Sequence, residues 1–246
     1  MTMNIRLDLR FDGTNYHGWQ IQPGKPTVQG ILKDAIFKVT GEDVTPNGCG
    51  RTDSGVHASG YVCNFETSSS VPCDRLPYAL NTFLPDDIVC VGAECVADDF
   101  SASYSAKAKT YRYTIDNSTF SDVFMQRFAW HYKYALDVDK MRRAGQYFLG
   151  THDFIGFAKS GFTVKTTVRT IYDIKIEKNN DIITIDVTGN GFLYNMVRII
   201  AGTLVFAGAG KLDPDSLGNI IDSGSRSMAG ITAPAKGLCR REVFYE

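Results

Sequence analysis

The sequence lacks the long apolar runs that mark membrane proteins. None of its 246 residues falls in an uninterrupted apolar stretch of the roughly 18 residues that a membrane span needs. The first eleven residues alternate apolar and polar side chains, whereas a secretory signal needs a solid apolar block before its cleavage site. With 43% hydrophobic and 22% charged residues, the composition excludes disordered and coiled-coil classes. We therefore expect a cytoplasmic protein.

Cysteine and histidine are also scarce. The six cysteines include no pair at CxxC spacing, and the four histidines form neither an HExxH motif nor a zinc-finger pattern. An even number of cysteines would allow disulfides, but six are sparse for this length. The sequence predicts free, mostly buried thiols in a reducing compartment and no structural metal.

The whole chain has little excess of either charge, since its formal net charge is −1, but its parts differ in charge. Residues 1–100 contain 7 Lys and Arg against 13 Asp and Glu, residues 101–200 contain 14 against 9, and residues 201–246 contain 5 of each. Random variation of surface charge explains such a division. An anionic partner bound by the middle of the chain is the alternative hypothesis.

Hydrophobic periodicity predicts the secondary structure. The first hundred residues alternate between strands and helices, and the remainder repeats this order with a hairpin and a long apolar helix. The expected strands are 5–11, 60–65, 88–96, 109–115, 127–134, 166–178, 181–189 and 242–245, and the expected helices are 27–41, 74–83, 138–150 and 192–208, with a short helix after Asp213 and Pro214.

These elements predict an α+β fold made of two similar α/β halves with mostly antiparallel sheets. A polar stretch of small residues at 100–110 indicates the boundary. We expect an N-terminal half at residues 1–103, which carries the Asp53 segment, and a C-terminal half at residues 104–246, which carries a basic strand and the helix of Arg198.

The segment GCGRTDSGVHASG, residues 48–60, concentrates glycines with short polar side chains. It matches neither a Walker loop nor a dinucleotide-binding fingerprint. It could be a surface turn in which Asp53 caps the following residues. Arg51 favours a functional site instead, because a nearby cation would keep a sheltered Asp53 carboxylate ionised.

A sheltered, ionised aspartate has few chemical uses: a metal ligand, a general base or a nucleophile. Only His57 lies near Asp53 in the sequence as a further ligand. No second carboxylate presents itself as a glycosidase partner. A lone nucleophile or base remains.

Two further segments combine unusual residues. In AKAKTYRYTI, residues 106–115, basic residues alternate with Tyr111 and Tyr113, which suits either a half-buried strand face or stacking on an unpaired base. In GNGFLYNMVRIIAGTL, residues 189–204, Arg198 interrupts an apolar helix. Arg198 either extends to water or meets a buried anion such as Asp53.

Together, GRTDSGVHASG, KTYRY and GFLYNMVRIIAGTL resemble the tRNA pseudouridine synthase A family, in that order and at suitable separations. The segments FDGTNYHGWQIQPGKPTVQG, LNTFLPDDI, GTHDFIGF and TAPAKGLCRREVFY are similar to the same family, so the resemblance covers nearly the whole chain.

The resemblance implies isomerisation of uridine to pseudouridine at positions 38, 39 and 40 in the anticodon stem-loop of tRNA. It also implies two halves that meet across a central cleft, a homodimer, and a reaction without a cofactor or metal. Asp53 matches the family's catalytic aspartate, the expected nucleophile, and Arg198 the arginine that pairs with it. Tyr111 matches the base-packing tyrosine and Arg51 the arginine that holds the surroundings of the flipped nucleotide.

Alternatives stay open on the residues alone. Asp53 could attack C6 of the base, or could attack or deprotonate the sugar, and either Asp53 or water could remove the C5 proton. The rival functions are an RNA-binding module without activity and a metal-dependent hydrolase built on Asp53 and His57.

Overall fold

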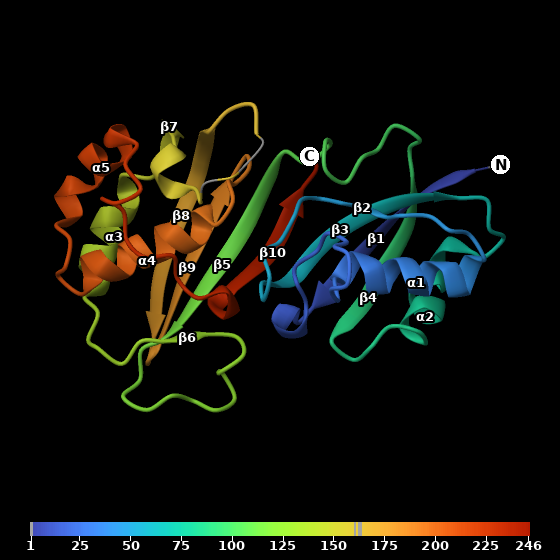
Figure 1. Cartoon of the computed structure of the whole chain (residues 1–246), viewed down its shortest axis with the longest axis horizontal. Coiled ribbons are helices and arrows are strands. Elements are labelled where there is room, and N and C mark those ends of the chain that lie inside the picture. The colour runs from blue at the N-terminus through green and yellow to red at the C-terminus, as the bar shows by residue number, and fades with distance from the viewer. Residues whose placement is uncertain (1, 160, 162–163) are drawn as a thin grey trace. The chain divides into compact units, whose positions relative to one another are not determined.

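The computed structural model describes residues 2–159, 161 and 164–246. The chain divides into two compact units, which are described separately (Figure 1). Unit 1 comprises residues 1–107 together with 240–246, and unit 2 comprises residues 108–239. The division differs from the expected 1–103 and 104–246 in two ways: the boundary falls four residues later, and the last seven residues belong to unit 1.

Unit 1 contains a sheet with the strand order β4-β1-β3-β10. Its strands are β1 (Met3–Phe11), β3 (His57–Thr67), β4 (Ile88–Val96) and β10 (Leu238–Phe244), and the short β2 (Asn47–Gly48) pairs with β3. β1 lies antiparallel between β3 and β4, with Leu7 opposite Cys63 on one side and Ala93 on the other. Alternation along β1 buries Ile5, Leu7 and Leu9 completely.

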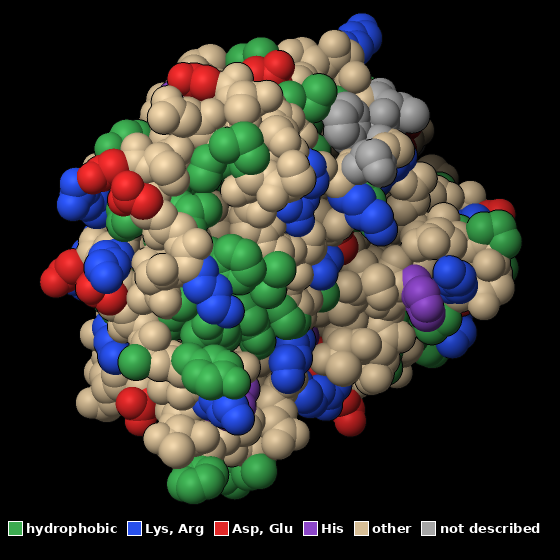
Figure 2. Space-filling view, turned by 60° about the vertical axis from the view of Figure 1, so that its left-hand side comes forward, with side chains coloured by type: hydrophobic (Ala, Val, Ile, Leu, Met, Phe, Trp, Pro, Cys, Tyr) green, Lys and Arg blue, Asp and Glu red, His purple; other side chains and the backbone are tan. Residues whose placement is uncertain are grey.

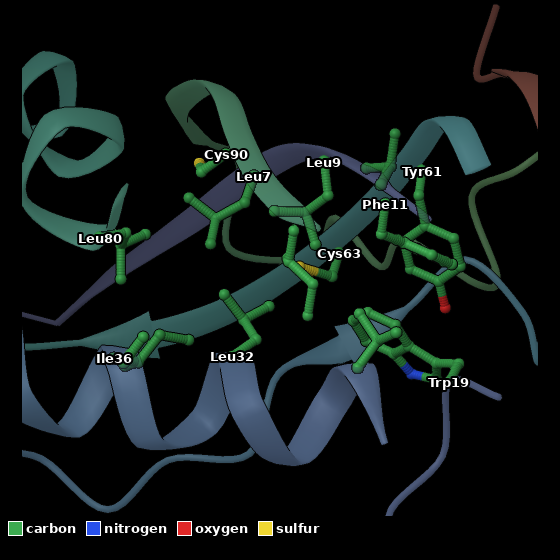
Figure 3. Close-up of a cluster of buried hydrophobic side chains, with 14 of the residues drawn as sticks. Leu7, Leu9, Phe11, Trp19, Leu32, Ile36, Tyr61, Cys63, Leu80 and Cys90 are labelled. Carbon is green, nitrogen blue, oxygen red and sulfur yellow. The ribbon is translucent and has the colours of Figure 1, made fainter. Parts of the chain in front are cut away.

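Two helices of unit 1 pack against this sheet. α1 (Val28–Thr40) begins after Thr27, whose side chain accepts the Gly30 N–H, and ends at Gly41 in the left-handed conformation. α2 is short (Leu76–Asn81) and lies near α1 and β4. Figure 3 shows the resulting core, in which α1 directs Leu32 and Ile36 toward side chains of the sheet.

The C-terminal segment joins unit 1 through long-range contacts. The Tyr245 hydroxyl donates to the Ala102 carbonyl at 2.9 Å, and the Tyr245 ring contacts Phe100. A Cβ at Gly60 of β3 would lie 2.1 Å from the carbonyl oxygen of Arg241, so the two strands approach closely. Such pairing across about 180 residues leaves no local signal, which is why the sequence assigned this segment to the second half.

Unit 2 contains a sheet with the strand order β5-β9-β8-β7. β5 (Ala108–Asp116), β9 (Ile182–Gly189), β8 (Val168–Asn179) and β7 (Gly150–Asp153) are antiparallel neighbours. The predicted hairpin is confirmed as β8 and β9, with Asn180 in the left-handed conformation at the turn.

Helices of unit 2 cover this sheet (Figure 1). α3 (Val138–Gln146) packs on β8 and α4 (Met196–Gly208), and α5 (Leu217–Ser223) lies near β7. α4 is buried along almost its whole length, as its apolar sequence predicts. Short 3-10 turns in the described residues occur at Gly13–Asn15, Cys73–Arg75, Ile155–Phe157, Pro214–Ser216 and Ala235–Gly237.

The strand expected at residues 127–134 is wrong. Only Trp130–His131, labelled β6, bridges to β5. The Asn117 side chain donates to the carbonyls of Tyr132 and Tyr134, so a side chain satisfies backbone groups that a strand partner would otherwise satisfy.

The α+β class with mostly antiparallel sheets is confirmed, whereas a cleft between the halves stays a prediction. None of the helices in the described residues is long and apolar enough to cross a membrane.

Candidate active site

Asp53 lies in unit 1, on the loop between β2 and β3. Its side chain is half-buried, between the buried Thr52 and the exposed Ser54. The Asp53 carbonyl accepts the Val56 N–H at 3.2 Å, which closes a tight turn over residues 53–56. The carboxylate therefore sits on a short, constrained turn rather than on a helix or strand.

A second loop of unit 1, residues 12–19, braces this turn. The Tyr16 carbonyl accepts the Gly55 N–H at 3.1 Å, and the Trp19 N–H reaches the Thr52 carbonyl at 3.4 Å. Gly18 has φ +83°, and a Cβ there would lie 2.3 Å from the Thr52 carbonyl oxygen. Glycine is therefore required at position 18, because the two backbones touch.

Buried aromatic side chains support the other end of the loop. The Tyr61 ring stacks on Trp19 with centroids 4.3 Å apart (Figure 3). The Tyr61 hydroxyl donates to the Gly50 carbonyl at 2.8 Å. A Cβ at Gly48 would collide with both rings, at 2.1 Å from the Tyr61 oxygen and 2.6 Å from Trp19. The glycines of this motif thus serve close packing as well as turns.

His57 and Thr52 are buried beside Asp53. The Gly13 N–H lies 3.0 Å from His57 Nδ1, and the same nitrogen lies 3.1 Å from an Asp12 carboxylate oxygen. The Thr52 hydroxyl oxygen is buried and has no hydrogen-bond partner among the residues that the structure describes. Thr52 therefore offers an unused polar group next to the carboxylate.

Arg51 is exposed, so its side chain lies at the surface of the loop. Its backbone is nevertheless held, because the Arg51 carbonyl accepts a hydrogen bond from the Arg240 guanidinium at 3.3 Å. The sequence predicts a role for the Arg51 side chain, and the structure shows in addition that a hydrogen bond holds the Arg51 carbonyl.

Tyr111 lies in unit 2, on β5 opposite Val187 of β9. It is buried, and the edge of its ring meets Phe192 with centroids 5.2 Å apart. Tyr113 is on the same face of β5, and its hydroxyl donates to the Pro234 carbonyl at 2.8 Å. The predicted shared tyrosine face is therefore present and buried.

Arg198 lies in the first turn of α4 and is half-buried. Its Nε donates to the Ala233 carbonyl at 2.7 Å, and its Nη1 donates to the Asn195 side-chain oxygen at 2.9 Å. Asn195 precedes the helix with φ 63°, so α4 begins later than the predicted residue 192. These two bonds orient the guanidinium at the start of the helix.

Arg198 and the tyrosine face meet at one segment of unit 2. Ala233 accepts from Arg198, and the next residue, Pro234, accepts from Tyr113. Burial raises the pKa of Tyr113 well above its usual value, and the positive charge of Arg198 opposes this rise. The motifs around Tyr111 and Arg198 thus form one cluster, with Ala233 and Pro234 between them.

The basic strand is less available to an anion than its sequence suggests. Arg112 donates to both carboxylate oxygens of Asp186, at 2.6 and 2.7 Å across β5 and β9. This bidentate pair neutralises Arg112 within the sheet. Arg112 is therefore less available to an anionic partner than the sequence alone indicates.

One cation of unit 2 lies beside an exposed aromatic ring: Lys159 Nζ is 5.6 Å from the centroid of the half-exposed Tyr194 ring. Arg169 lies near Gly191, since its Nε would be 3.7 Å from a Cβ added there. Burial lowers the pKa of Arg169 from its usual value. Figure 2 shows Lys and Arg side chains (blue) around a patch of hydrophobic side chains (green) on the face that it presents.

The predicted residues lie in both units: Asp53 and Arg51 on one loop of unit 1, and Tyr111 and Arg198 in unit 2, where Tyr113, on the same strand face as Tyr111, and Arg198 donate to adjacent carbonyls. Sequence reasoning missed Arg240 and Asn195, which hold backbone and side-chain groups of the two sites. An asparagine directly before an apolar helix was an available signal for Asn195, whereas Arg240 gave none. No group of three or more metal-ligating side chains occurs within residues 2–159, 161 and 164–246.

Comparison with known proteins identifies relatives along the whole chain. The profile of the tRNA pseudouridine synthase family matches residues 9–105 and 144–246. The tRNA pseudouridine synthase A of Thermoanaerobacter sp. (strain X514) is 50% identical over 242 residues, covering 98% of this chain and 99% of the relative. The tRNA pseudouridine synthase A of Acetivibrio thermocellus has the same identity and coverage.

A solved archaeal box H/ACA sRNP complex contains a chain with a TM-score of 0.39 and 12% identity to this one, covering 95% of this chain and 46% of that chain. This likeness is too weak to bear on the function.

The strong matches place the chain in the class of pseudouridine synthases, which are isomerases. More narrowly, the chain belongs to the tRNA pseudouridine synthase family. The resemblance drawn from the motifs around Asp53, Tyr111 and Arg198 is thereby confirmed.

Proposed function

We propose that this protein isomerises uridine to pseudouridine at positions 38, 39 and 40 in the anticodon stem-loop of tRNA, with Asp53 as the catalytic nucleophile. The observation that carries this proposal is the braced turn of unit 1, which holds a half-buried carboxylate in place. A rigid mount suits a nucleophile, because catalysis depends on holding the attacking atom in reach of the substrate.

The reaction breaks the bond between ribose C1′ and N1, turns the uracil over and joins C1′ to C5. The proton on C5 leaves, and N1 ends with a proton, so nothing is oxidised or hydrolysed. Asp53 forms a transient covalent bond, either at C6 of the base or at C1′, and is released when the product forms. Asp53 or a water molecule takes the C5 proton. A reaction with these steps needs no cofactor and no metal.

Tyr111 and Arg198 of unit 2 and Arg51 of unit 1 supply the remaining roles. Tyr111 packs against the displaced base, which has left its stack to be reached. Its buried position against Phe192 supports a packing surface rather than a mobile side chain. Arg198 keeps the Asp53 carboxylate ionised during the reaction. Arg51 holds the surroundings of the flipped nucleotide, which its exposure permits.

Local basic groups bind the RNA, because the protein's net charge of −1 provides no overall electrostatic attraction to an anionic partner. Lys159 and Tyr194 together offer a cation for a phosphate and a half-exposed ring for an unpaired base. We infer that this surface contacts the stem-loop. Binding is then expected to weaken as the salt concentration rises.

We also propose that the protein is a cytoplasmic homodimer. The absence of CxxC pairs and the six free cysteines support a reducing compartment. Sedimentation at micromolar concentration tests the dimer, and a monomer there would contradict it.

The direct test of the function is to incubate the purified protein with unmodified tRNA and map pseudouridine along the product. We expect pseudouridine at positions 38, 39 and 40 wherever these are uridines, also in the presence of a strong chelator. Modification elsewhere would overturn the assigned positions, and loss of activity with the chelator would support the metal-dependent alternative. Tight binding without any pseudouridine would support the rival RNA-binding module.

A further inference from the structure

Arg240 is a buried cation in unit 1. It is 2% exposed, on the part of β10 that belongs to this unit, whereas its neighbour Arg241 is exposed. A guanidinium is rarely buried, because leaving water costs free energy unless hydrogen bonds replace its hydration. Its partners therefore indicate why it is there.

The Arg240 guanidinium reaches the residues that lead directly into the catalytic turn. Its Nη1 donates to Cys49 Sγ at 2.9 Å and to the Gly50 carbonyl at 3.1 Å, and its Nη2 donates to the Arg51 carbonyl at 3.3 Å. These acceptors belong to three consecutive residues, 49–51, and Asp53 follows two residues later. One planar fork thus holds the backbone on the N-terminal side of Asp53.

Tyr61 completes this support. Its hydroxyl donates to the same Gly50 carbonyl, and its ring lies below the guanidinium, whose central carbon is 5.1 Å from the ring centroid. The C-terminal side of the turn is held by the backbone bonds of Gly55 and Val56, which depend on the path that the chain takes through residues 49–53. The loop is therefore held at both ends, and Arg240 is 187 residues away from Asp53 in sequence.

We propose that Arg240 is a positioning residue for the catalytic carboxylate: its bonds to the Gly50 and Arg51 carbonyls set the path of the backbone that presents Asp53. This inference rests on the proposed role of Asp53. A planar fork holds two carbonyls in a fixed relation, which a lysine, a single flexible donor, cannot reproduce. A displacement of about 1 Å at a reacting group can lower the rate about 100-fold.

The choice of arginine argues against a purely structural role. Buried charged groups and their charged partners can often be replaced together by apolar side chains of similar volume with little loss of stability, so stability alone does not call for a buried arginine. Replacing Arg240 alone removes a donor from the Gly50 and Arg51 carbonyls, so some loss of stability accompanies the loss of orientation. A charged fork aimed at the loop carbonyls is explained by the need to orient the loop.

The test compares Arg240→Leu and Arg240→Lys with the matched control Arg241→Leu. Three properties are measured on each full-length variant: the thermal midpoint, the single-turnover rate and Kd for an anticodon stem-loop, and the hydrogen-exchange rates of the Gly55 and Val56 amides. For Arg240→Leu we expect a folded protein whose rate falls about 100-fold, a Kd within about twofold of the wild type, and faster exchange of both amides.

For Arg240→Lys we expect a rate between those of Arg240→Leu and the wild type, because one donor remains. Arg241→Leu should leave the single-turnover rate and the exchange rates unchanged. A folded Arg240→Leu with the wild-type rate, or an equal loss in Arg241→Leu, would overturn the proposal. Should Arg240→Leu not fold, wild-type rate and exchange in Arg240→Lys and in Tyr61→Phe would overturn it instead.

Failure of this inference is distinguishable from failure of the proposed function. An inactive wild-type protein would contradict the function, whereas an active wild type with an equally active Arg240→Leu would contradict only the role of Arg240.

Discussion

The two units hold their functional side chains by different means. In unit 1, Asp53 sits on a turn that distant groups brace, from Tyr16 and Trp19 on one side and Arg240 on the other. In unit 2, Tyr111 is carried by the strand β5 and Arg198 by the first turn of a buried helix. The carboxylate thus depends on long-range hydrogen bonds, and the tyrosine and arginine depend on regular secondary structure.

This difference decides how each site responds to substitution. A loop held by a few hydrogen bonds moves when one of them is removed, because it lacks the repeated backbone hydrogen bonds of a helix or a sheet. A strand or helix keeps its course when a single side chain changes. We therefore expect changes around Asp53 to act through position, and changes around Arg198 to act through the chemistry of the side chain itself.

Apart from changes to Asp53 itself, the largest effect that would sharpen the contrast is expected for Arg198→Ala. It removes the side-chain bonds to Ala233 and Asn195 and the positive charge at the start of α4. We expect the single-turnover rate to fall about 100- to 1,000-fold, while circular dichroism shows that α4 stays folded. Arg198→Lys should restore less than about a tenth of the lost rate. Near-normal turnover by Arg198→Ala would remove Arg198 from the site.

A second, smaller effect is expected for Gly48→Ala in unit 1. The new methyl group would collide with Tyr61 and Trp19, at a cost of about 3 kcal/mol in the free energy of unfolding. Gly24→Ala is the control, since a Cβ there meets nothing within 4 Å and only its φ of +69° opposes alanine, at about 1 kcal/mol. Urea titration of both variants measures the difference. Equal costs would show that close packing is not the reason for glycine at position 48.

The pH dependence of unit 2 offers a third test. Burial alone would raise the pKa of Asp116, but hydrogen bonds from Ser118 and Asp122 outweigh it and hold that pKa below its usual value. A depressed carboxylate pKa contributes stability that is present above the unfolded pKa of about 4 and is lost as the pH falls through the folded value. We expect Asp116→Asn to lower the free energy of unfolding by about 1 kcal/mol at pH 7 and to make that free energy depend less on pH below pH 4. Unfolding measurements at several pH values test this, and an unchanged loss of stability below pH 4 would contradict it.

The smallest effect is expected for the cross-strand pair of Arg112 and Asp186. Both side chains are partly exposed, so water screens their attraction. A double-mutant cycle with Arg112→Gln and Asp186→Asn should give a coupling energy below about 1 kcal/mol. A coupling energy of several kcal/mol would mean that side-chain bonds, rather than the ladder of β5 and β9, fix this strand.

Much of the fold could be predicted because its signals are local. The N-cap Thr27 and the terminal Gly41 define α1, and the turn at Asn180 separates two alternating strands. The segment 127–134 alternates like a strand yet forms mostly loop, because β5 offers it only a two-residue bridge and Asn117 caps its carbonyls. Pattern alone does not report which backbone groups already have partners.

The residues of the candidate site likewise fall into those that local sequence signals predict and those that they do not. The glycine-rich segment, the paired tyrosines and a charged residue in an apolar helix were all visible as local anomalies. Arg240 was not, since CRREV contains two adjacent arginines and only the three-dimensional path of β10 decides which one is buried. Tyr16 and Arg240 support the Asp53 turn from about 40 and about 190 residues away. Local periodicity does not reveal contacts at such separations.

The central claim, that the braced turn of unit 1 supplies the reacting carboxylate, is tested most directly by Asp53→Asn. This change keeps the size of the side chain but removes its charge and most of its nucleophilicity. The measurement is a single-turnover assay on an anticodon stem-loop beside a filter-binding titration. We expect pseudouridine formation to fall by about 1,000-fold or more while Kd stays within about twofold, because phosphate contacts supply most of the affinity. Undiminished turnover by Asp53→Asn would contradict the account.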